Sequence, residues 1–330
     1  MARMIQTVTG PVPSDQLGGV LCHEHVLFGY PGYQGDITEN VWDEERFIHE
    51  VEPVVAKIKQ QGIKTIVDAT PNDMGRDVEI LKRFSERCGI NVICSTGYYY
   101  EHGGAPAYWR FRKNFGFPAE EELYALFQKE LEQGVAQTGI RAGVIKVGTG
   151  IGEMSDYERM MFTVAAHLAR ENPDVRIITH CTHGTMLKEQ ADFFLQEGVN
   201  PRQVQLGHFC DTTDLSTQMY CLEKGFYAGF DRMGQVNFDG MPDDEFRLAS
   251  IAGLVSYGYG EQILLSNDRL YWIFGREFPF PEAVRENLIK EWHWTYIFDK
   301  VLPRLETMGL REEQTHRLMF ENPQRFYGGD

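Results

Sequence analysis

Two histidines separated by one residue follow a short apolar run near the N-terminus. Residues 20–26 read Val-Leu-Cys-His-Glu-His-Val. Because alternate residues of a strand point to the same side, His23 and His25 would aim at one point and Glu24 away from it. Two imidazoles that converge at the end of a buried strand can hold a transition metal. One of them could equally be a satisfied core histidine, so the pair alone leaves both interpretations open.

Further polar side chains occupy equivalent places along the rest of the chain. Six residues end an apolar run in this way: His23, His25, Lys146, His180, His208 and Asp268. The carboxyl ends of the parallel strands of an α/β barrel meet on one face, and active sites are built there. A purely structural explanation would need an unrelated coincidence at each position. The set therefore predicts a metal site.

Each residue type in the set has a chemical reason to be there. Neutral imidazoles and a carboxylate can hold two divalent ions, provided that something bridges the ions. Lys146 is the unusual member, because an ammonium group would repel cations. Desolvation beside cations would depress its pKa and expose a free amine. Such an amine can add carbon dioxide and become a carbamate, an anionic bridge with two oxygens. Taken alone, Lys146 would be read as a buried lysine paired with a carboxylate.

A regular alternation of elements places these residues. Short apolar runs typical of strands buried on both faces alternate with amphipathic segments of helical period. The predicted strands are residues 19–22, 63–69, 90–95, 143–147, 175–179, 203–207, 226–230 and 263–266. The main predicted helices are residues 41–62, 76–88, 119–137, 155–170, 184–198, 215–225 and 242–257. Eight such units predict an α/β fold, a closed (β/α)₈ TIM barrel. A doubly wound open sheet is the alternative, but no GxGxxG follows the first strand.

The chain is expected to form a single domain over residues 1–330. A short N-terminal β-hairpin is predicted within residues 1–18, the barrel within residues 19–275, and helices within residues 276–330. An aromatic, glycine-containing insertion spans residues 101–118.

Composition excludes several classes of partner. The formal net charge of −16 argues against a nucleic-acid or anionic-membrane partner, because both need a positive face. The six cysteines show no CxxC spacing, which favours free thiols in a reducing compartment. No apolar run is long enough to span a bilayer, and the N-terminus lacks an apolar signal region. We therefore expect a cytoplasmic protein.

The motifs around the six residues resemble the phosphotriesterase family of the amidohydrolase superfamily, and most closely its lactonase-like branch. They run in order through nearly the whole chain to the terminal Glu-Asn-Pro-Gln-Arg-Phe. They read His-Glu-His, Val-Ile-Lys-Val, Thr-His-Cys at His180, Gly-His-Phe-Cys-Asp at His208, Gly-Phe-Asp-Arg ending at Arg232 and Leu-Ser-Asn-Asp ending at Asp268.

The resemblance implies a binuclear metal centre. His23, His25 and Asp268 would hold a buried metal, and His180 and His208 a more exposed one. Carboxylated Lys146 and a hydroxide would bridge the two ions. Zinc is the default, and cobalt, manganese or iron would also suit these ligand types. His183 competes for the role of His180, but His180 directly follows the apolar run.

The resemblance also implies a hydrolase, most simply a lactonase that opens a lactone ring by attack of the bridging hydroxide. Asp268 would take the hydroxide proton and pass it to the leaving group. Tyr99 and Arg232 match positions that orient the lactone over the metals. Tyr98 and Tyr100 leave the tyrosine assignment open. Another ester hydrolase with the same centre, such as a phosphotriesterase, and a metal-bound ligand-binding protein without turnover are the alternatives.

Further expectations concern the surroundings of the site. Arg232 could instead pair with a structural carboxylate such as Asp231. The aromatic segment 269–281 is expected to be a long loop, either an apolar wall for a small-molecule lactone or ester, or part of a dimer interface. Arg269 and Arg276 in that segment could hold an anionic group. A homodimer is expected from the family resemblance. By strand alternation, three cysteines are expected to point out of the barrel: Cys22, Cys181 and Cys210.

Overall fold

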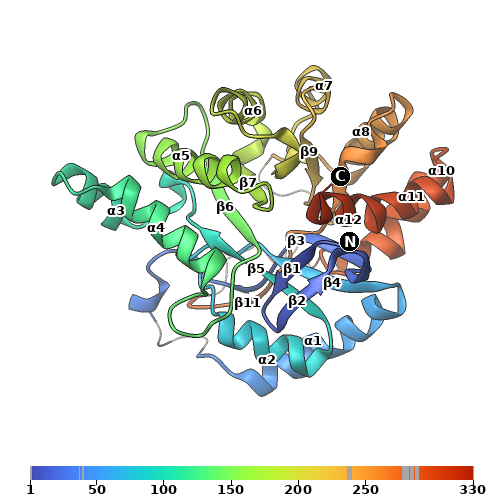
Figure 1. Cartoon of the computed structure of the whole chain (residues 1–330). Coiled ribbons are helices and arrows are strands. Elements are labelled where there is room, and N and C mark those ends of the chain that lie inside the picture. Colours follow the sequence, from blue (N-terminus) through green and yellow to red (C-terminus); the bar gives the residue numbers. More distant parts are fainter. Residues whose placement is uncertain are drawn as a thin grey trace.

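The computed structural model describes residues 2–36, 38, 41–235, 240–276, 282, 286 and 290–329. Parallel strands alternate with helices, and the helices surround a central curled sheet (Figure 1). The strands of the predicted units are β3 (Gly19–Phe28), β4 (Ile63–Asp68), β5 (Asn91–Gly97), β6 (Val144–Thr149), β7 (Ile177–Cys181), β8 (Val204–Leu206), β9 (Tyr227–Phe230) and β10 (Ile263–Leu265). The predicted (β/α)₈ barrel is confirmed. Strand β3 is longer than predicted, because it continues through both histidines to Phe28.

The ladder of the barrel sheet runs in the order β10-β9-β8-β7-β6-β5-β4-β3-β11. Strand β11 (Leu270–Ile273) lies parallel to β3, with Leu270 opposite His25. The expectation of a loop at residues 269–281 is therefore wrong for its first part, while residues 277–281 lie outside the described residues. The ends of the sheet meet where the Asp268 backbone N–H donates to the His23 carbonyl (3.1 Å). This contact brings the end of β10 beside β3.

The helices begin where the sequence provides caps. The principal ones are α1 (Glu44–Gln60), α2 (Val78–Cys88), α4 (Ala119–Glu132), α5 (Asp156–Glu171), α6 (Leu187–Gln196), α7 (Leu215–Glu223) and α8 (Asp244–Ser256). Ser155 and Glu158 form a capping box at the start of α5. Asp43 and Asp77 accept backbone N–H groups in the first turns of α1 and α2. The predicted insertion contains a helix, α3 (Ala107–Asn114), which projects from one side of the barrel (Figure 1).

The chain ends close one mouth of the barrel. Strands β1 (Met4–Thr7) and β2 (Gly10–Pro13) form the predicted hairpin as a separate two-stranded antiparallel sheet. The C-terminal part contains a π-helix, η8 (Ile297–Val301), followed by α10 (Leu302–Thr307), α11 (Glu312–Met319) and α12 (Glu321–Gly328). Helix α12 contacts β1, so the two ends of the chain lie side by side (Figure 1). Within the described residues, no helix is both long and apolar enough to cross a bilayer.

An apolar layer fills the barrel interior at this closed end. Its members are Ile5, Leu17, Val20, Cys22, Val67, Ile93, Val144, Ile178, Tyr227, Leu264, Phe326 and Tyr327, all buried. Val144 and Ile178 precede Lys146 and His180 by two residues, so they share the inward face of their strands. The apolar layer therefore lies directly beneath the residues predicted to do chemistry.

Cys22 corrects one sequence-based expectation. It belongs to the apolar layer and does not point out of the barrel. The pairing of β3 with β4 shifts register between Leu21 and Glu24, which is the signature of a β-bulge. The irregularity places the neighbouring Cys22 and His23 on the same side. Cys181 and Cys210 pack in the outer core cluster, as predicted.

Candidate metal centre

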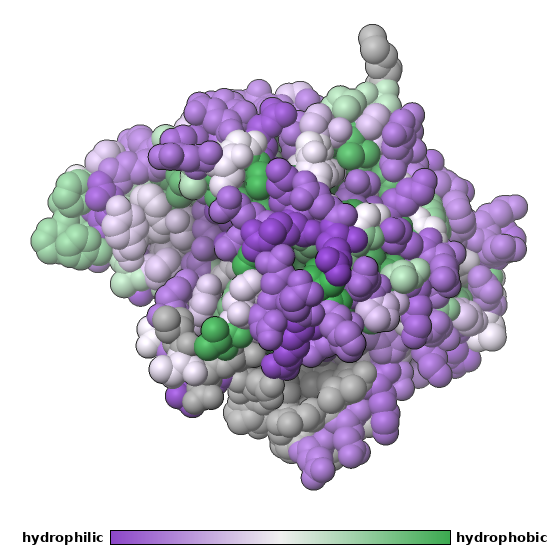
Figure 2. Space-filling view, turned by 90° about the horizontal axis from the view of Figure 1, so that it is seen from below, coloured by the Kyte–Doolittle hydropathy of each residue, from purple (hydrophilic) through white to green (hydrophobic). Residues whose placement is uncertain are grey.

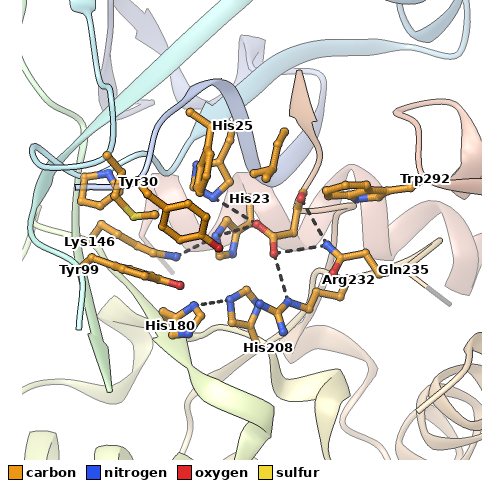
Figure 3. Close-up of a pocket in the computed structure, with 15 residues that line it drawn as sticks. His23, His25, Tyr30, Tyr99, Lys146, His180, His208, Arg232, Gln235 and Trp292 are labelled. Carbon is orange, nitrogen blue, oxygen red and sulfur yellow. Dashed lines mark hydrogen bonds and ion pairs between the residues drawn. The ribbon is translucent and has the colours of Figure 1, made fainter. Parts of the chain in front are cut away.

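The six residues singled out in the sequence meet in one cavity of about 110 Å³ (Figure 3). None has more than 8% of its surface exposed: His23, His25, Lys146, His180, His208 and Asp268. We call this set the polar rim. The Lys146 Nζ lies 2.8 Å from the His23 Nε2. The His208 Nε2 lies 2.7 Å from the His180 Nδ1. The His25 Nε2 lies 3.1 Å from a carboxylate oxygen of Asp268.

One buried carboxylate orients two of the imidazoles. Asp231 is fully buried, and its two oxygens lie 2.6 Å from the His23 Nδ1 and 3.0 Å from the His208 Nδ1. An ionised carboxylate only accepts hydrogen bonds, so both Nδ1 atoms carry the proton. In the neutral form of each ring, Nε2 is then the nitrogen without a proton. This is the arrangement that carboxylates impose on metal-binding histidines.

Hydroxyl groups orient the other two imidazoles. The His25 Nδ1 lies 2.7 Å from the Thr70 hydroxyl, and the His180 Nε2 lies 3.0 Å from the Thr182 hydroxyl. The remaining nitrogen of each ring faces the cavity. Ligand atoms of His23, His25 and Asp268 lie within 4.8 Å of one another, as do those of a second group, His23, His208 and Asp231. The Asp231 oxygens already accept the Nδ1 protons. We therefore assign Asp231 the role of orienting the histidines. The other members of the two groups, which could bind a metal ion directly, are called the donor set.

The donor set fits a pair of divalent cations. Imidazole nitrogens and a carboxylate are the ligands that zinc and its neighbours prefer, and each one has a partner behind it that holds its orientation. Such outer partners are typical of metal sites. An apolar core would have no need for side chains that orient imidazoles.

Two members of the polar rim occupy left-handed backbone. His208 has φ 54° and Asp268 has φ 51°. Such conformations cost on the order of 1–3 kcal/mol for residues other than glycine, and they persist only where the surroundings fix them. The His208 N–H donates to Asp231 (2.9 Å), and the Asp268 N–H donates to the His23 carbonyl. The fold thus holds both residues where their side chains reach the cavity.

Burial shifts the pKa values of the polar rim toward the protonation states in which side chains can bind a metal ion. Burial lowers the pKa of Lys146 to about 8, against the opposing charges of Asp268 and Asp231. Burial and the nearby Lys146 lower the pKa of His23 to about 3, and burial lowers that of His180 far below its usual value. Burial opposes ionisation of Asp268, but the His25 hydrogen bond and the neighbouring imidazoles hold its pKa well below the usual range. His23 and His180 are therefore neutral imidazoles, and Asp268 is an ionised carboxylate.

Arg232 lies at the mouth of this group but does not pair with Asp231. Its Nε donates to an Asp268 oxygen (3.1 Å), and its Nη1 donates to Asp211 (2.5 Å). Asp211 also accepts from Arg247 (3.4 Å). Arg232 therefore pairs with a buried structural carboxylate as suggested, but that carboxylate is Asp211 and not Asp231, because both Asp231 oxygens face the imidazoles. Although burial opposes it, these carboxylates raise the pKa of Arg232.

Among the three consecutive tyrosines, Tyr99 lines the cavity (Figure 3). Its ring lies edge-on to His180, with centroids 5.0 Å apart, and Tyr100 stacks on His180 at the same distance. Tyr98 packs instead against Trp109 and Phe127. The Tyr99 backbone N–H donates to Asp73 (3.1 Å), whose pKa burial raises to about 7.

The sequence did not indicate several other residues of the wall. Tyr30, Gln235 and Trp292 line the cavity with the apolar Phe28, Pro71 and Met74, whereas Leu270, which also lines it, belongs to the segment 269–281 that was expected to form an apolar wall. Gln235 follows Arg232 by three residues and Tyr30 follows β3, so proximity to predicted site residues was the available signal. Nothing comparable marks Trp292, which follows the barrel strands by a long interval.

The remaining candidates do not line the cavity. His183, the competitor of His180, lies in a short 3₁₀ turn with φ 53°. The Arg269 guanidinium stacks over the ring of Trp292 at 4.7 Å, and Arg276 pairs with Asp36 (2.7 Å). The suggestion that Arg269 and Arg276 hold an anionic group of the substrate therefore gains no support.

Comparisons with known proteins agree with this geometry. The model of the Phosphotriesterase family matches residues 3–327. A solved structure of a mutant PTE-like lactonase from Deinococcus radiodurans is 39% identical, with a TM-score of 0.94 over 98% of this chain and 100% of that chain. The aryldialkylphosphatase of Saccharolobus solfataricus is 29% identical over 96% of each chain. The phosphotriesterase homology protein of Mycobacterium tuberculosis is 28% identical over 98% of this chain and 97% of the relative.

Proposed function

This chain belongs to the phosphotriesterase family, and we propose that it is a metal-dependent hydrolase whose main substrates are lactones. The observation that carries the proposal is the convergence of the polar rim in one buried cavity, with an orienting partner behind each imidazole. The similarity to a PTE-like lactonase over the whole chain supports the choice of substrate class.

We assign the polar rim to two divalent ions, zinc by default, with cobalt, manganese and iron also suited to these ligands. His23, His25 and Asp268 would hold one ion, and His180 and His208 the other. Lys146 would bridge them as a carbamate: its neutral Nζ forms a bond to the carbon of carbon dioxide and releases one proton. When bound, the ions would lower the pKa of a water to near neutrality and polarise the ester oxygen.

The chain's own residues would handle the proton and the substrate. Asp268 is kept ionised by its neighbours, so its carboxylate can accept the proton of the attacking water and return it to the leaving oxygen. The Arg232 Nε, which donates to Asp268, fixes the orientation of that carboxylate. Tyr99 and Arg232 would orient the ring of the lactone above the rim.

The wall of the cavity favours an uncharged substrate with an apolar part. Phe28, Met74, Leu270 and Trp292 provide apolar surface. Among the described lining residues the cations are Lys146 and Arg232, and Arg232 already pairs with two carboxylates. The phosphate of a phosphorylated lactone would therefore find no unpaired cationic side chain among these residues. A neutral phosphotriester would fit as well as a neutral lactone, so phosphotriesterase activity is the second candidate, supported by the aryldialkylphosphatase relative. Third is a metal-bound ligand-binding protein without turnover.

Metal analysis combined with a substrate panel tests the proposal. Protein reconstituted separately with zinc, cobalt, manganese or iron should bind two metal ions per chain. The panel holds γ- and δ-lactones of increasing alkyl length, aryl esters, and neutral dialkyl aryl phosphates. We expect the highest kcat/KM on a lactone, with weaker turnover of phosphotriesters. Metal-free protein after reconstitution would contradict the metal centre. A preference for phosphotriesters would reverse the order of the two candidates, and bound metal without hydrolysis would favour a binding role.

We also propose a homodimer in the cytoplasm. Helix α3 and its flank expose aromatic side chains in a patch at one end of the molecule (Figure 2): Tyr108, Phe111, Phe115 and Phe117. This patch would be covered by a second copy. All six cysteines are buried and unpaired, which suits a reducing compartment. Light scattering after size-exclusion chromatography should give twice the chain mass. The double variant Phe111→Ser/Phe115→Ser should give the mass of one chain, and an unchanged mass would remove this patch from the interface.

A further inference from the structure

Glu24 lies between the two histidines of the motif but takes no part in the donor set. It is fully buried and does not line the cavity, so it faces the opposite side of β3 from His23 and His25. A buried carboxylate is costly unless its oxygens are hydrogen-bonded. The hydrogen bonds that Glu24 accepts therefore indicate its structural role.

Its two oxygens accept four hydrogen bonds. One oxygen accepts from the Ser266 hydroxyl (2.6 Å) and the Asn267 backbone N–H (2.8 Å). The other accepts from the Arg269 backbone N–H (2.8 Å) and the Trp294 indole (2.9 Å). Burial raises the pKa of Glu24 to about 8, but four donors face its oxygens and occupy the about four lone-pair directions of an ionised carboxylate. Three of the four donors belong to the turn 266–269 that links β10 to β11.

Asp268 sits in the middle of that turn, in the left-handed backbone conformation described above. The N–H groups on both sides of it, from Asn267 and Arg269, are those that Glu24 accepts. On the other side of the turn, the Trp292 indole and the Gln235 amide donate to the Asn267 carbonyl at 2.7 and 3.3 Å. Hydrogen bonds on two sides of the turn thus fix the backbone around Asp268.

The same carboxylate also ties this turn to the histidines. The Ser266 hydroxyl donates to Glu24 and accepts from the His23 backbone N–H (2.9 Å). Glu24 itself is the residue between His23 and His25 in β3. One side chain therefore joins the strand that presents two members of the polar rim to the turn that presents a third.

We propose that Glu24 is a positioning residue, whose carboxylate holds the turn 266–269 in place and thereby sets Asp268 against His23 and His25. The consequence for metal affinity rests on the function proposed above, whereas the effect on the turn does not. Removal of an outer-sphere partner of this kind typically weakens metal binding by about 10–100-fold.

Three variants and one matched control isolate this role. Glu24→Gln keeps the shape but turns an amide N–H toward donors. Glu24→Asp keeps the charge and shortens the reach. Trp294→Phe removes the one donor outside the turn, together with part of a buried ring. The control is Glu158→Gln, because Glu158 is also buried and also accepts backbone N–H groups, from Gly150 (3.1 Å) and Ser155 (3.1 Å), in loops without a proposed metal ligand.

The first readout needs no metal. Amide hydrogen exchange of metal-free protein should speed up at residues 267–269 in Glu24→Gln and Glu24→Asp by at least about tenfold relative to wild type. Trp294→Phe and Glu158→Gln should leave exchange at these residues unchanged. Unchanged exchange in both Glu24 variants would overturn the proposal, and it would do so whatever the protein binds.

The second readout is the affinity of cobalt in competition with a chelator. We expect a loss of about 10–100-fold in the Glu24 variants and less than about twofold in Glu158→Gln. Wild-type affinity in Glu24→Gln, despite faster exchange of the turn, would show that the turn does not control the metal site and would overturn that part. If wild-type protein binds no cobalt, the proposed function fails, while the exchange measurement still decides the role of Glu24.

Discussion

The two ends of the barrel interior are filled with opposite kinds of side chain, although the same strands supply both. In β7, Ile178 belongs to the apolar layer and His180, two residues later, to the polar rim. In β6, Val144 and Lys146 are related in the same way. Because each pair shares one face of one strand, the difference between the two ends is a difference of chemistry rather than of backbone.

Opposite energetics follow from this difference. Each fully buried large aliphatic side chain of the apolar layer contributes about 1.5–3 kcal/mol through removal of its surface from water. The polar rim buries groups that water would solvate well, and the lowered pKa values of Lys146 and His180 are the sign of that cost. The hydrogen bonds of the imidazoles with Asp231, Thr70 and Thr182 offset only part of it. The apolar layer therefore stabilises the fold, whereas the polar rim costs stability and is held in place by the rest of the fold.

The largest effect is expected where the proposed bridge is lost. Lys146→Ala should release the metals and lower kcat/KM by more than about 10³-fold, beyond the cost of removing a single oxyanion-stabilising donor. Metal analysis and turnover of the best lactone measure both. Val144→Ala, two residues earlier on the same face, should keep both metals per folded chain. Full activity with both metals retained in Lys146→Ala would end the carbamate proposal.

The β7 pair tests the comparison most directly. Ile178→Ala should lower the free energy of unfolding by about 2–5 kcal/mol, because it opens a cavity in the apolar layer, and should leave the metal content of folded protein unchanged. His180→Ala should lose one metal ion while the metal-free protein keeps its stability, since a desolvated imidazole is removed. Urea titration of metal-free protein gives the free energy of unfolding of each variant, and metal analysis gives its metal content. Equal losses of stability would mean that the polar rim is a structural core.

Asp231 should show an intermediate effect that spreads over the whole rim. Asp231→Asn keeps the shape, but its amide cannot accept from both Nδ1 atoms of His23 and His208. We expect metal affinity to fall by about 10–100-fold at both sites together, because the two histidines are assigned to different ions. Stepwise cobalt titration against a chelator resolves the sites. A loss confined to one site would contradict the shared orienting role.

The sequence indicated the barrel and the six residues of the polar rim because both depend on local pattern. Apolar runs of strand length recur with helices between them, and five of the eight runs end at or beside a member of the polar rim. The roles of these residues as metal ligands stay predictions. Tyr99 and Arg232 were suggested by the family resemblance, and the structure places both on the wall of the cavity.

What the sequence missed depends on contacts between distant segments. His23 and Asp231 are 208 positions apart, so nothing local marks Asp231 as an orienting carboxylate. Strand alternation placed Cys22 outside the barrel, because alternation assumes a regular ladder and a register shift leaves no local trace. Strand β11 was read as a loop, since its pairing partner, β3, lies near the other end of the chain.

The smallest predicted effect concerns the outer edge of the rim, by which we mean Tyr99 and Asp73. The Asp73 carboxylate accepts a hydrogen bond from the Tyr99 backbone N–H there. Burial raises the pKa of Asp73 to about 7 from its ordinary value of 3.8. Between these two values the folded protein binds a proton that the unfolded chain does not, so this contribution to stability is present at low pH and is lost as pH rises through about 7. Asp73→Asn cannot titrate, so its melting temperature should gain about 2–4 °C relative to wild type between pH 5 and pH 8. Ile178→Ala, which changes no titratable group, should differ from wild type by a constant amount over the same range. A constant offset for Asp73→Asn as well would show that the carboxylate is ionised throughout, and that the outer edge of the rim is open to water rather than buried with the rest.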